Sequence, residues 1–377
     1  MSQPLSPLIQ YTLRGLKHCY MPNVGLWSHK YHFDWTGDRN ESLRHSDLFY
    51  SLNVLLGMGR IGVENVAGDY DCRALYDAAA NNLLTAPVRH YAYGMALWAA
   101  DVLGCDVPTP VLAKVRELTA DSSAMQSWMA QDVGLMLTGV CSLAKHDSSW
   151  RPVAQRLRDL ILTHFLGPRD LFYDSGVGLR RHFASFATQV YSTLGLYYYG
   201  DLTADPKAYA AADACIRKLI SVQGSLGEWP WFYNVAGGHV IDFYEVYSVH
   251  QHGMAPAILH HAVARGVPGA REALHKGFLW IFGANEMAKT MLRPEVHLIH
   301  RSQKRAGFRG SREARVIRSV VNKALGRHDK IEGNGGAGLE FTQEVRSYEL
   351  GWILWSFGGR DDYADLTSHQ DFVRALT

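Results

Sequence analysis

Long hydrophobic runs are missing from this sequence of 377 residues. No stretch of about 18 uncharged apolar residues occurs, which excludes a membrane-spanning helix. The N-terminus lacks a charged start followed by an apolar segment and a small-residue cleavage site, so we expect a cytoplasmic protein. The five cysteines are far apart and never form a CxxC pair, which disfavours disulfide and metal roles.

Motifs of several common enzyme classes are also absent. The sequence holds no G-x-S-x-G nucleophile elbow, no Walker A loop and no H-E-x-x-H zinc helix. The segment GNGGAG at 333–338 has the spelling of a dinucleotide loop but follows no strand, so we interpret it as a flexible loop. His250 and His252 would point in different directions from one helix and make a poor metal pair. We therefore expect neither a cofactor nor a metal.

Charge is low overall but uneven along the chain. The formal net charge is +2, whereas eleven Lys and Arg residues stand against three acidic residues between Arg293 and Lys330. This basic excess favours an anionic partner, and we expect no nucleic acid. Within it, the segment 311–327 has the pattern of an amphipathic helix with a cationic rim. Such a helix could lie on the anionic inner membrane beside a lipid-linked glycan, or pack on the outside of the fold.

Apolar residues recur at steps of three and four almost throughout, and alternating strand-like runs are nearly absent. The pattern predicts an all-α chain. Gly and Pro end one helix and begin the next, and such short links imply antiparallel neighbours. The expected helices cover about 5–20, 44–59, 71–84, 88–104, 109–120, 124–144, 149–165, 182–200, 205–223, 247–265, 267–283, 311–325, 343–358 and 362–375.

Longer connections are few, at about 21–43, 167–181, 224–246, 284–310 and 331–342. The first and third are too rich in Trp and Tyr for disorder, so we expect them to line one mouth of the fold. Segments 91–104, 186–200 and 253–266 echo one another as helices that end in Gly. Repeated helical hairpins bury their apolar faces against neighbours, which favours a closed ring or a solenoid.

A family resemblance rests on the order FATQVYSTLGLYYYG, Gln223, GEWPWFYN, Gly238, VYSVHQHGMAP, WIFGANE and YELGWILW. This order resembles bacterial proteins that accompany polysaccharide-assembly enzymes. Those proteins are in turn similar to the six-hairpin superfamily of glycoside hydrolases, polysaccharide lyases and sugar epimerases. Over roughly 40–360 the resemblance implies an (α/α)6 toroid with a sugar-binding cleft at one end, but it carries over no catalytic residue. We expect one toroid domain over 1–377, with a basic helical insertion at about 293–330.

The stretch from Gly227 to Pro256 combines aromatic rings, carboxylates and imidazoles, which suits a ligand cleft better than a core segment or a plain loop. In it, Trp229 and Trp231 could stack on sugar rings, with Tyr233 beside them, or could pack in the core. Glu228, flanked by aromatic surface, is our candidate for the acid, since desolvation raises the pKa of a carboxyl group. The alternative for Glu228 is an exposed salt bridge.

The later part of the same stretch supplies five more candidates. Asp242 and Glu245 could serve as carboxylate partners of Glu228, although Asp242 also fits the cap of a helix that begins near Val246. Tyr247 and His250 would share one helix face with Gln251. Such a Tyr/His pair could move a proton at a sugar carbon while Gln251 binds hydroxyls, or the face could pack on a neighbouring helix.

A second stretch, 27–47, has a similar composition. Asp34 could be a catalytic carboxylate, Trp35 could contact sugar, and Arg44 could bind a carboxylate or phosphate. Arg346, in the late segment EVRSYELGW, is a further candidate for substrate binding, although an ion pair with Glu349 fits its spacing better.

These residues favour a saccharide-processing enzyme. The first hypothesis is a glycoside hydrolase whose mechanism depends on two carboxylates. A uronate lyase or sugar epimerase that uses Tyr247 and His250 is the second. The third is a non-catalytic glycan-binding subunit of a polysaccharide-assembly system.

Overall fold

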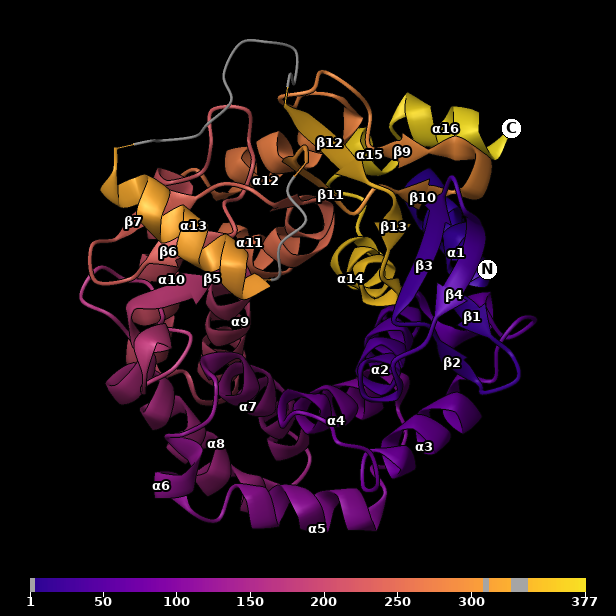
Figure 1. Cartoon of the computed structure of the whole chain (residues 1–377). Coiled ribbons are helices and arrows are strands. Elements are labelled where there is room, and N and C mark those ends of the chain that lie inside the picture. The colour runs from indigo at the N-terminus through magenta and orange to yellow at the C-terminus, as the bar shows by residue number, and fades with distance from the viewer. Residues whose placement is uncertain (1–3, 308–311, 327–337) are drawn as a thin grey trace.

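The computed structural model describes residues 4–307, 312–326 and 338–377, and its helices form a closed ring (Figure 1). The inner wall of the ring closes because each helix packs on the next and the last packs on the first. Its members are α2 (Arg44–Ile61), α4 (Tyr91–Leu103), α7 (Ala130–Ala144), α9 (Phe186–Thr203), α11 (Ala255–Ala264) with the preceding π-helical turn (His250–Met254), and α14 (Ser347–Phe357).

Inner and outer helices alternate along the chain, and an inner helix is followed by an outer helix that returns along it (Figure 1). The outer helices are α3 (Cys72–Asn82), α5 (Thr109–Leu118), α8 (Arg151–Leu160), α10 (Pro206–Ser221) and α12 (Ala270–Leu279). At the seam, α1 (Pro7–Cys19) packs against both α14 and α16 (Gln370–Leu376), so the two ends of the described chain meet. The remaining α-helices of the described residues are α6 (Ser122–Met125), α13 (Arg312–Ala324) and α15 (Ala364–Thr367). This is the expected (α/α)6 toroid.

Glycines let the inner helices approach backbone to backbone. A Cβ atom on Gly94 of α4 would lie 2.3 Å from the carbonyl oxygen of Leu135 in α7, and one on Gly139 would lie 2.2 Å from the carbonyl oxygen of Gly94. The same pairing puts Leu97 beside Gly139, so α4 and α7 run parallel. Because inner and outer helices alternate in direction, the inner helices all begin at one end of the ring, which we call the N-terminal mouth.

Short antiparallel strands gather at the N-terminal mouth, before the inner helices begin. Within the described residues, three sheets of three strands have the orders β13-β3-β4, β12-β11-β8 and β5-β6-β7, and two further pairs are β1-β2 and β9-β10. The strands are β1 (Tyr20–Met21), β2 (Leu26–Trp27), β3 (Lys30–Asp34), β4 (Gly37–Glu41), β5 (Phe183–Ser185), β6 (Phe232–Asn234), β7 (His239–Asp242), β8 (Val246–Tyr247), β9 (Leu292–Arg293), β10 (Leu298–Ile299), β11 (Ser302–Arg305), β12 (Leu339–Thr342) and β13 (Glu344–Val345).

These strands correct the sequence analysis, which expected loops at most of their positions and helices over β5, β13 and parts of β1 and β8. The basic segment 293–330 was expected to be helical, but over its described part it contains β10, β11 and α13. The expected helix at 124–144 is divided into α6 and α7, and 362–375 is divided into α15 and α16. The possible dinucleotide loop at 333–338 lies, apart from its last residue, outside the described residues.

Candidate active site

A pocket of about 370 Å³ opens at the N-terminal mouth, among the strands that precede α2, α11 and α14. Its volume is in the usual range for small-ligand sites. The lining combines segments far apart in the sequence: Lys30, Asp242, Tyr244, Glu245, Tyr247, Arg301, Lys304, Arg305, Arg318, Ser319, Thr342, Glu344 and Arg346. The sequence analysis expected loops 21–43 and 224–246 to line one mouth. This arrangement agrees with that expectation, because Lys30 comes from 21–43 and Tyr244 and Glu245 come from 224–246.

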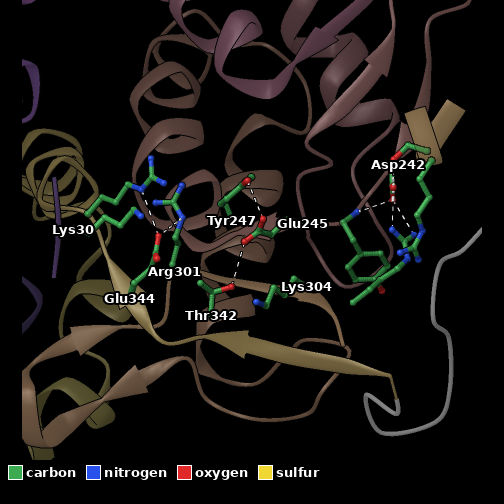
Figure 2. Close-up of a pocket in the computed structure, with 13 residues that line it drawn as sticks. Lys30, Asp242, Glu245, Tyr247, Arg301, Lys304, Thr342 and Glu344 are labelled. Carbon is green, nitrogen blue, oxygen red and sulfur yellow. Dashed lines mark hydrogen bonds and ion pairs between the residues drawn. The ribbon is translucent and has the colours of Figure 1, made fainter. Parts of the chain in front are cut away.

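Glu245 occupies the middle of the pocket (Figure 2). The hydroxyl of Tyr247 donates to its Oε2 at 3.1 Å, while Ser302 and Thr342 donate to Oε1, the latter at 3.3 Å. These hydroxyls form a row across three strands, because Ser302 is the register partner of both Tyr247 and Thr342. Directly opposite residues in antiparallel strands share a face of the sheet. The sheet β12-β11-β8 thus fixes the orientation of this carboxylate, which is 7% exposed.

Asp242 lies on the side of the pocket that faces α13. Its two carboxylate oxygens accept hydrogen bonds from the guanidinium of Arg305 at 3.0 Å each, and Ser319 of α13 donates to Oδ2 at 2.6 Å. This bidentate geometry is the strong form of an Arg–carboxylate pair. Asp242 ends β7 and does not cap a helix, so the capping role expected from the sequence is wrong; Val246 and Tyr247 form β8 instead.

On the opposite side of the pocket, Arg301 lies between two glutamates. Its guanidinium donates to Glu349 and lies 3.3 Å from an oxygen of Glu344, and it is positioned 5.0 Å from the centroid of the Tyr247 ring. Burial opposes the charge of Arg301, but the carboxylate of Glu349 and the other nearby acidic groups raise its pKa well above the usual value. Arg301 is therefore a fixed cation at the pocket wall.

The expected ion pair between Arg346 and Glu349 is also wrong. The ion-pair partner of Glu349 is Arg301, and Arg346 reaches Glu349 only through its backbone N–H, at 3.4 Å. The guanidinium of Arg346 lies 3.6 Å from Glu344 and donates to the hydroxyl of Tyr50 at 3.2 Å. Burial raises the pKa of Glu349 to about 7 despite the nearby Arg301. Arg346 lines the pocket.

The lining has more positive than negative side chains. Six basic residues, Lys30, Arg301, Lys304, Arg305, Arg318 and Arg346, stand against three acidic residues, Asp242, Glu245 and Glu344. The inner helices also begin at this mouth, and a helix N-terminus carries a partial positive charge. Both features favour a ligand with a negatively charged group.

Glu228 and its aromatic neighbours lie in the protein interior and do not line this pocket. Glu228 is fully buried, and its Oε2 accepts a hydrogen bond from the backbone N–H of Leu226 at 3.0 Å. Trp229 stacks on Phe186 with 5.5 Å between ring centroids. Trp231 and Tyr233 are also buried, and the hydroxyl of Tyr233 donates to the carbonyl of Pro230. These rings fill the space beneath the mouth, where β6 meets the start of α9.

The candidates from 27–47 lie on β3, on its turn and at the start of α2, away from the lining. Trp35 is 94% exposed in the turn between β3 and β4. Asp34 accepts hydrogen bonds from Arg39 and Thr36, which hold the pKa of Asp34 well below its usual value. Arg44 donates to the side-chain oxygen of Asn82 at 3.1 Å.

Tyr247 and the pair His250 and Gln251 are separated by the end of β8. Tyr247 lines the pocket, whereas His250 is buried behind it, with 5.2 Å between the two ring centroids. Burial, together with the nearby cation of Arg301, lowers the pKa of His250 to about 3. Gln251 donates to the carbonyl of Tyr247 and accepts from the backbone N–H of Trp229, so its amide holds the two segments together.

The sequence analysis did not select most of the basic lining residues individually, although the basic excess at 293–330 pointed to their segment. Lys30 and Tyr244 lie in the two stretches singled out for their composition but were not selected individually. Thr342 and Glu344 were not selected either, because β12 and β13 reach the pocket only through strand pairing. Among the described residues, no group of three or more His, Cys, Asp or Glu side chains is arranged to hold a metal ion. No helix in the described part of the chain is both long and apolar enough to cross a membrane.

Comparison with known proteins gives similarity of structure only. No protein-family model matches the sequence, and no curated protein matches it. An unsaturated glucuronyl hydrolase from Bacillus sp. GL1 is 12% identical with a TM-score of 0.58, over 93% of this chain and 93% of that chain. An unsaturated glucuronyl hydrolase specific for heparin is 13% identical with a TM-score of 0.58, over 98% of this chain and 96% of that chain. A family 76 glycoside hydrolase from a bovine Bacteroides thetaiotaomicron strain is 10% identical with a TM-score of 0.57, over 94% and 77%. At these identities the likeness confirms the expected (α/α)6 fold.

Proposed function

We propose that the protein is a carbohydrate-active enzyme of the glycoside hydrolase type and that Glu245 transfers the proton at the scissile bond. The observation that carries this proposal is the position of Glu245, which lines the pocket and is oriented by the hydroxyls of Tyr247, Ser302 and Thr342. By contrast, both oxygens of Asp242 bind Arg305, and Glu344 lies between Arg301 and Arg346. The proposal therefore moves the proton-transfer role from Glu228 to Glu245.

Hydrolysis of a glycoside requires a proton for the leaving oxygen and an activated water for the sugar carbon. A carboxylate fixed by a row of hydroxyls is pre-organised for such a transfer, since it need not reorient when the substrate binds. Asp242 and Glu344, on opposite sides of Glu245, are the carboxylates from which the second catalytic group would come (Figure 2).

The substrate in this proposal is a saccharide that carries an acidic group. The four Arg and two Lys side chains of the lining support it, because a guanidinium binds carboxylate, sulfate or phosphate oxygens in a bidentate manner and an ammonium attracts them as a point charge. Two of the structural neighbours are glucuronyl hydrolases, which agrees with this choice at the level of fold.

A second reaction, elimination or epimerisation at a uronate, is favoured by one further contact. The guanidinium of Arg301 lies 5.0 Å from the ring centroid of Tyr247, so a cation that could neutralise a uronate carboxylate stands beside a phenol. With its own proton passed to Glu245, which already accepts its hydrogen bond, the phenolate could take the neighbouring proton. His250, the partner expected from the sequence, is buried behind Tyr247 and outside the lining.

A panel of oligosaccharides tests the proposal. We would incubate the protein with neutral glycans and with matched glycans that contain uronate or sulfate, and separate the products by chromatography. Hydrolysis should release a reducing sugar from the acidic glycans only. Elimination would instead create a conjugated double bond that absorbs in the ultraviolet. Binding without any product would support a glycan-binding subunit and would contradict the enzyme proposal.

The remaining proposals concern organisation and location. We propose that residues 1–377 form one toroid domain that works in the cytoplasm without a cofactor. We also propose a peripheral contact between the basic segment 293–330 and an anionic membrane, which would bring the pocket to a lipid-linked glycan. This segment contains eleven basic and three acidic residues, and the excess of positive charge supports the contact.

A further inference from the structure

Helix α13 forms one wall of the pocket. Arg318 and Ser319 line the cavity, and Ser319 is anchored to Asp242 by a hydrogen bond of 2.6 Å. The helix also packs against β7, in front of the sheet β5-β6-β7 in Figure 1. One face of α13 is therefore committed to the site, and Asp242 is the residue that attaches it.

Large apolar side chains occupy the solvent side of the same helix. Ile317, Val321 and Leu325 follow one another at intervals of four residues, and their exposed fractions are 64%, 48% and 60%. The helical path extends beyond Ala324, because the N–H of Leu325 donates to the carbonyl of Val321 at 3.0 Å. Residues four apart lie on one helix face, so the three side chains form a continuous stripe. We call this stripe the outer face of α13.

Charge indicates what would cover the outer face. The segment that contains α13 has a strong basic excess, eleven Lys and Arg residues against three acidic ones, although Lys304, Arg305 and Arg318 of this segment line the pocket. A helix with an apolar stripe inside a cationic segment matches the surface of an anionic bilayer, where apolar side chains enter the acyl boundary and cations meet phosphate.

We infer that the outer face of α13 docks on an anionic lipid surface and that the same helix presents the pocket to a saccharide attached to a lipid. The pocket would then lie within one helix diameter of the lipid headgroups, roughly 10 Å. The docking stands on the exposed apolar stripe of α13 and on the basic excess of its segment, whereas the lipid-linked substrate rests on the proposed saccharide-processing function.

Vesicle sedimentation tests the docking. The test variant is Ile317→Glu with Val321→Glu. The matched control is Val24→Glu with Val63→Glu, which places the same charges at apolar side chains 54% and 39% exposed elsewhere on the molecule. The milder pair Ile317→Ser with Val321→Ser covers the case in which the acidic pair disturbs folding, and melting temperatures are compared throughout.

Wild type and control should sediment with vesicles of phosphatidylglycerol and phosphatidylcholine, and added salt should weaken this binding. Binding of the α13 variants should fall at least about tenfold. No binding, equal binding to pure phosphatidylcholine vesicles, or an equal loss in test and control variants would overturn the docking. A change of oligomeric state in the α13 variants with unchanged vesicle binding would also overturn it, because the outer face would then be a contact between copies of the chain.

The two proposals fail separately. If Glu245→Gln removes activity but keeps vesicle binding, both stand. If Glu245→Gln leaves activity intact while the α13 variants lose vesicle binding, the catalytic role of Glu245 fails and the docking survives. If the α13 variants process free and lipid-linked saccharides at the same rates as wild type, the substrate part of the inference is wrong.

Discussion

Glu245 accepts a hydrogen bond from the hydroxyl of Tyr247 at 3.1 Å, from a residue only two positions along the chain. The other oxygen of Glu245 is bound by Ser302 and Thr342, which come from strands far along the sequence. The central carboxylate of the pocket is thus held by one local contact and two that exist only after the sheet β12-β11-β8 has formed.

Replacement of Tyr247 by Phe removes the local contact and keeps the ring. A hydrogen bond to a charged group contributes about 1.5–3 kcal/mol, so we expect kcat to fall roughly 10- to 100-fold. A complete loss of turnover would instead favour Tyr247 as the base of an elimination reaction.

Close packing of the inner helices makes Gly94→Ala strongly destabilising. The new methyl group would lie 2.3 Å from the carbonyl oxygen of Leu135, so α4 and α7 must separate. We expect a loss of about 3 kcal/mol in the free energy of unfolding, measured by urea denaturation. Gly68→Ala is the matched control, because a Cβ there meets nothing within 4 Å, and its effect should stay within about 0.5 kcal/mol. Equal stability of the two variants would contradict the packing described for the ring.

Acid should destabilise the protein through its buried histidines. Burial lowers the pKa of His252 to about 3, and His29, His250 and His300 also have pKa values well below the usual one. A histidine with a lowered folded pKa binds fewer protons in the folded than in the unfolded state. Its contribution to stability is therefore present above the unfolded pKa and is lost as the pH falls below about 6.5.

The variant His252→Gln isolates one of these histidines. Each buried histidine should remove about 2 kcal/mol from the free energy of unfolding when the pH falls from about 7.5 to 5. Over the same pH range the His252→Gln variant should therefore lose about 2 kcal/mol less than the wild type. The exposed His239, replaced by Gln, is the control and should leave the pH dependence unchanged. If the wild type and the His252 variant lose stability in parallel, His252 is not held neutral by burial.

The ring of helices could be predicted from the sequence because each helix has its own periodic pattern. The segment expected at 88–104 forms α4 at Tyr91–Leu103, and the one at 343–358 forms α14 at Ser347–Phe357. Strands of two to five residues carry no comparable pattern, since their positions depend on pairing with distant segments. For this reason β8, β11 and β12 were expected as parts of loops or of a helix.

The site could be predicted only in part, for the same reason. Asp242, Glu245, Tyr247 and Arg346 line the pocket, as expected for residues near a cleft. Glu228 and Trp229 belong to the same aromatic stretch, but they fold beneath the mouth, where burial of large rings stabilises the junction of strands and helices. Composition identified the stretch but not which of its side chains face the ligand, because the chain reverses direction between β6 and β7.

The central claim, that Glu245 transfers a proton to a bound saccharide, is tested most directly by turnover of the best acidic oligosaccharide by Glu245→Gln. The control is Glu340→Gln, which makes the same charge change at an exposed glutamate on β12 that pairs with Lys304 at 3.3 Å. The amide keeps the shape of the side chain but cannot transfer the proton, so we predict that kcat falls at least about 100-fold while substrate binding and melting temperature stay near those of the wild type. Retention of most of the wild-type kcat by Glu245→Gln would contradict the account.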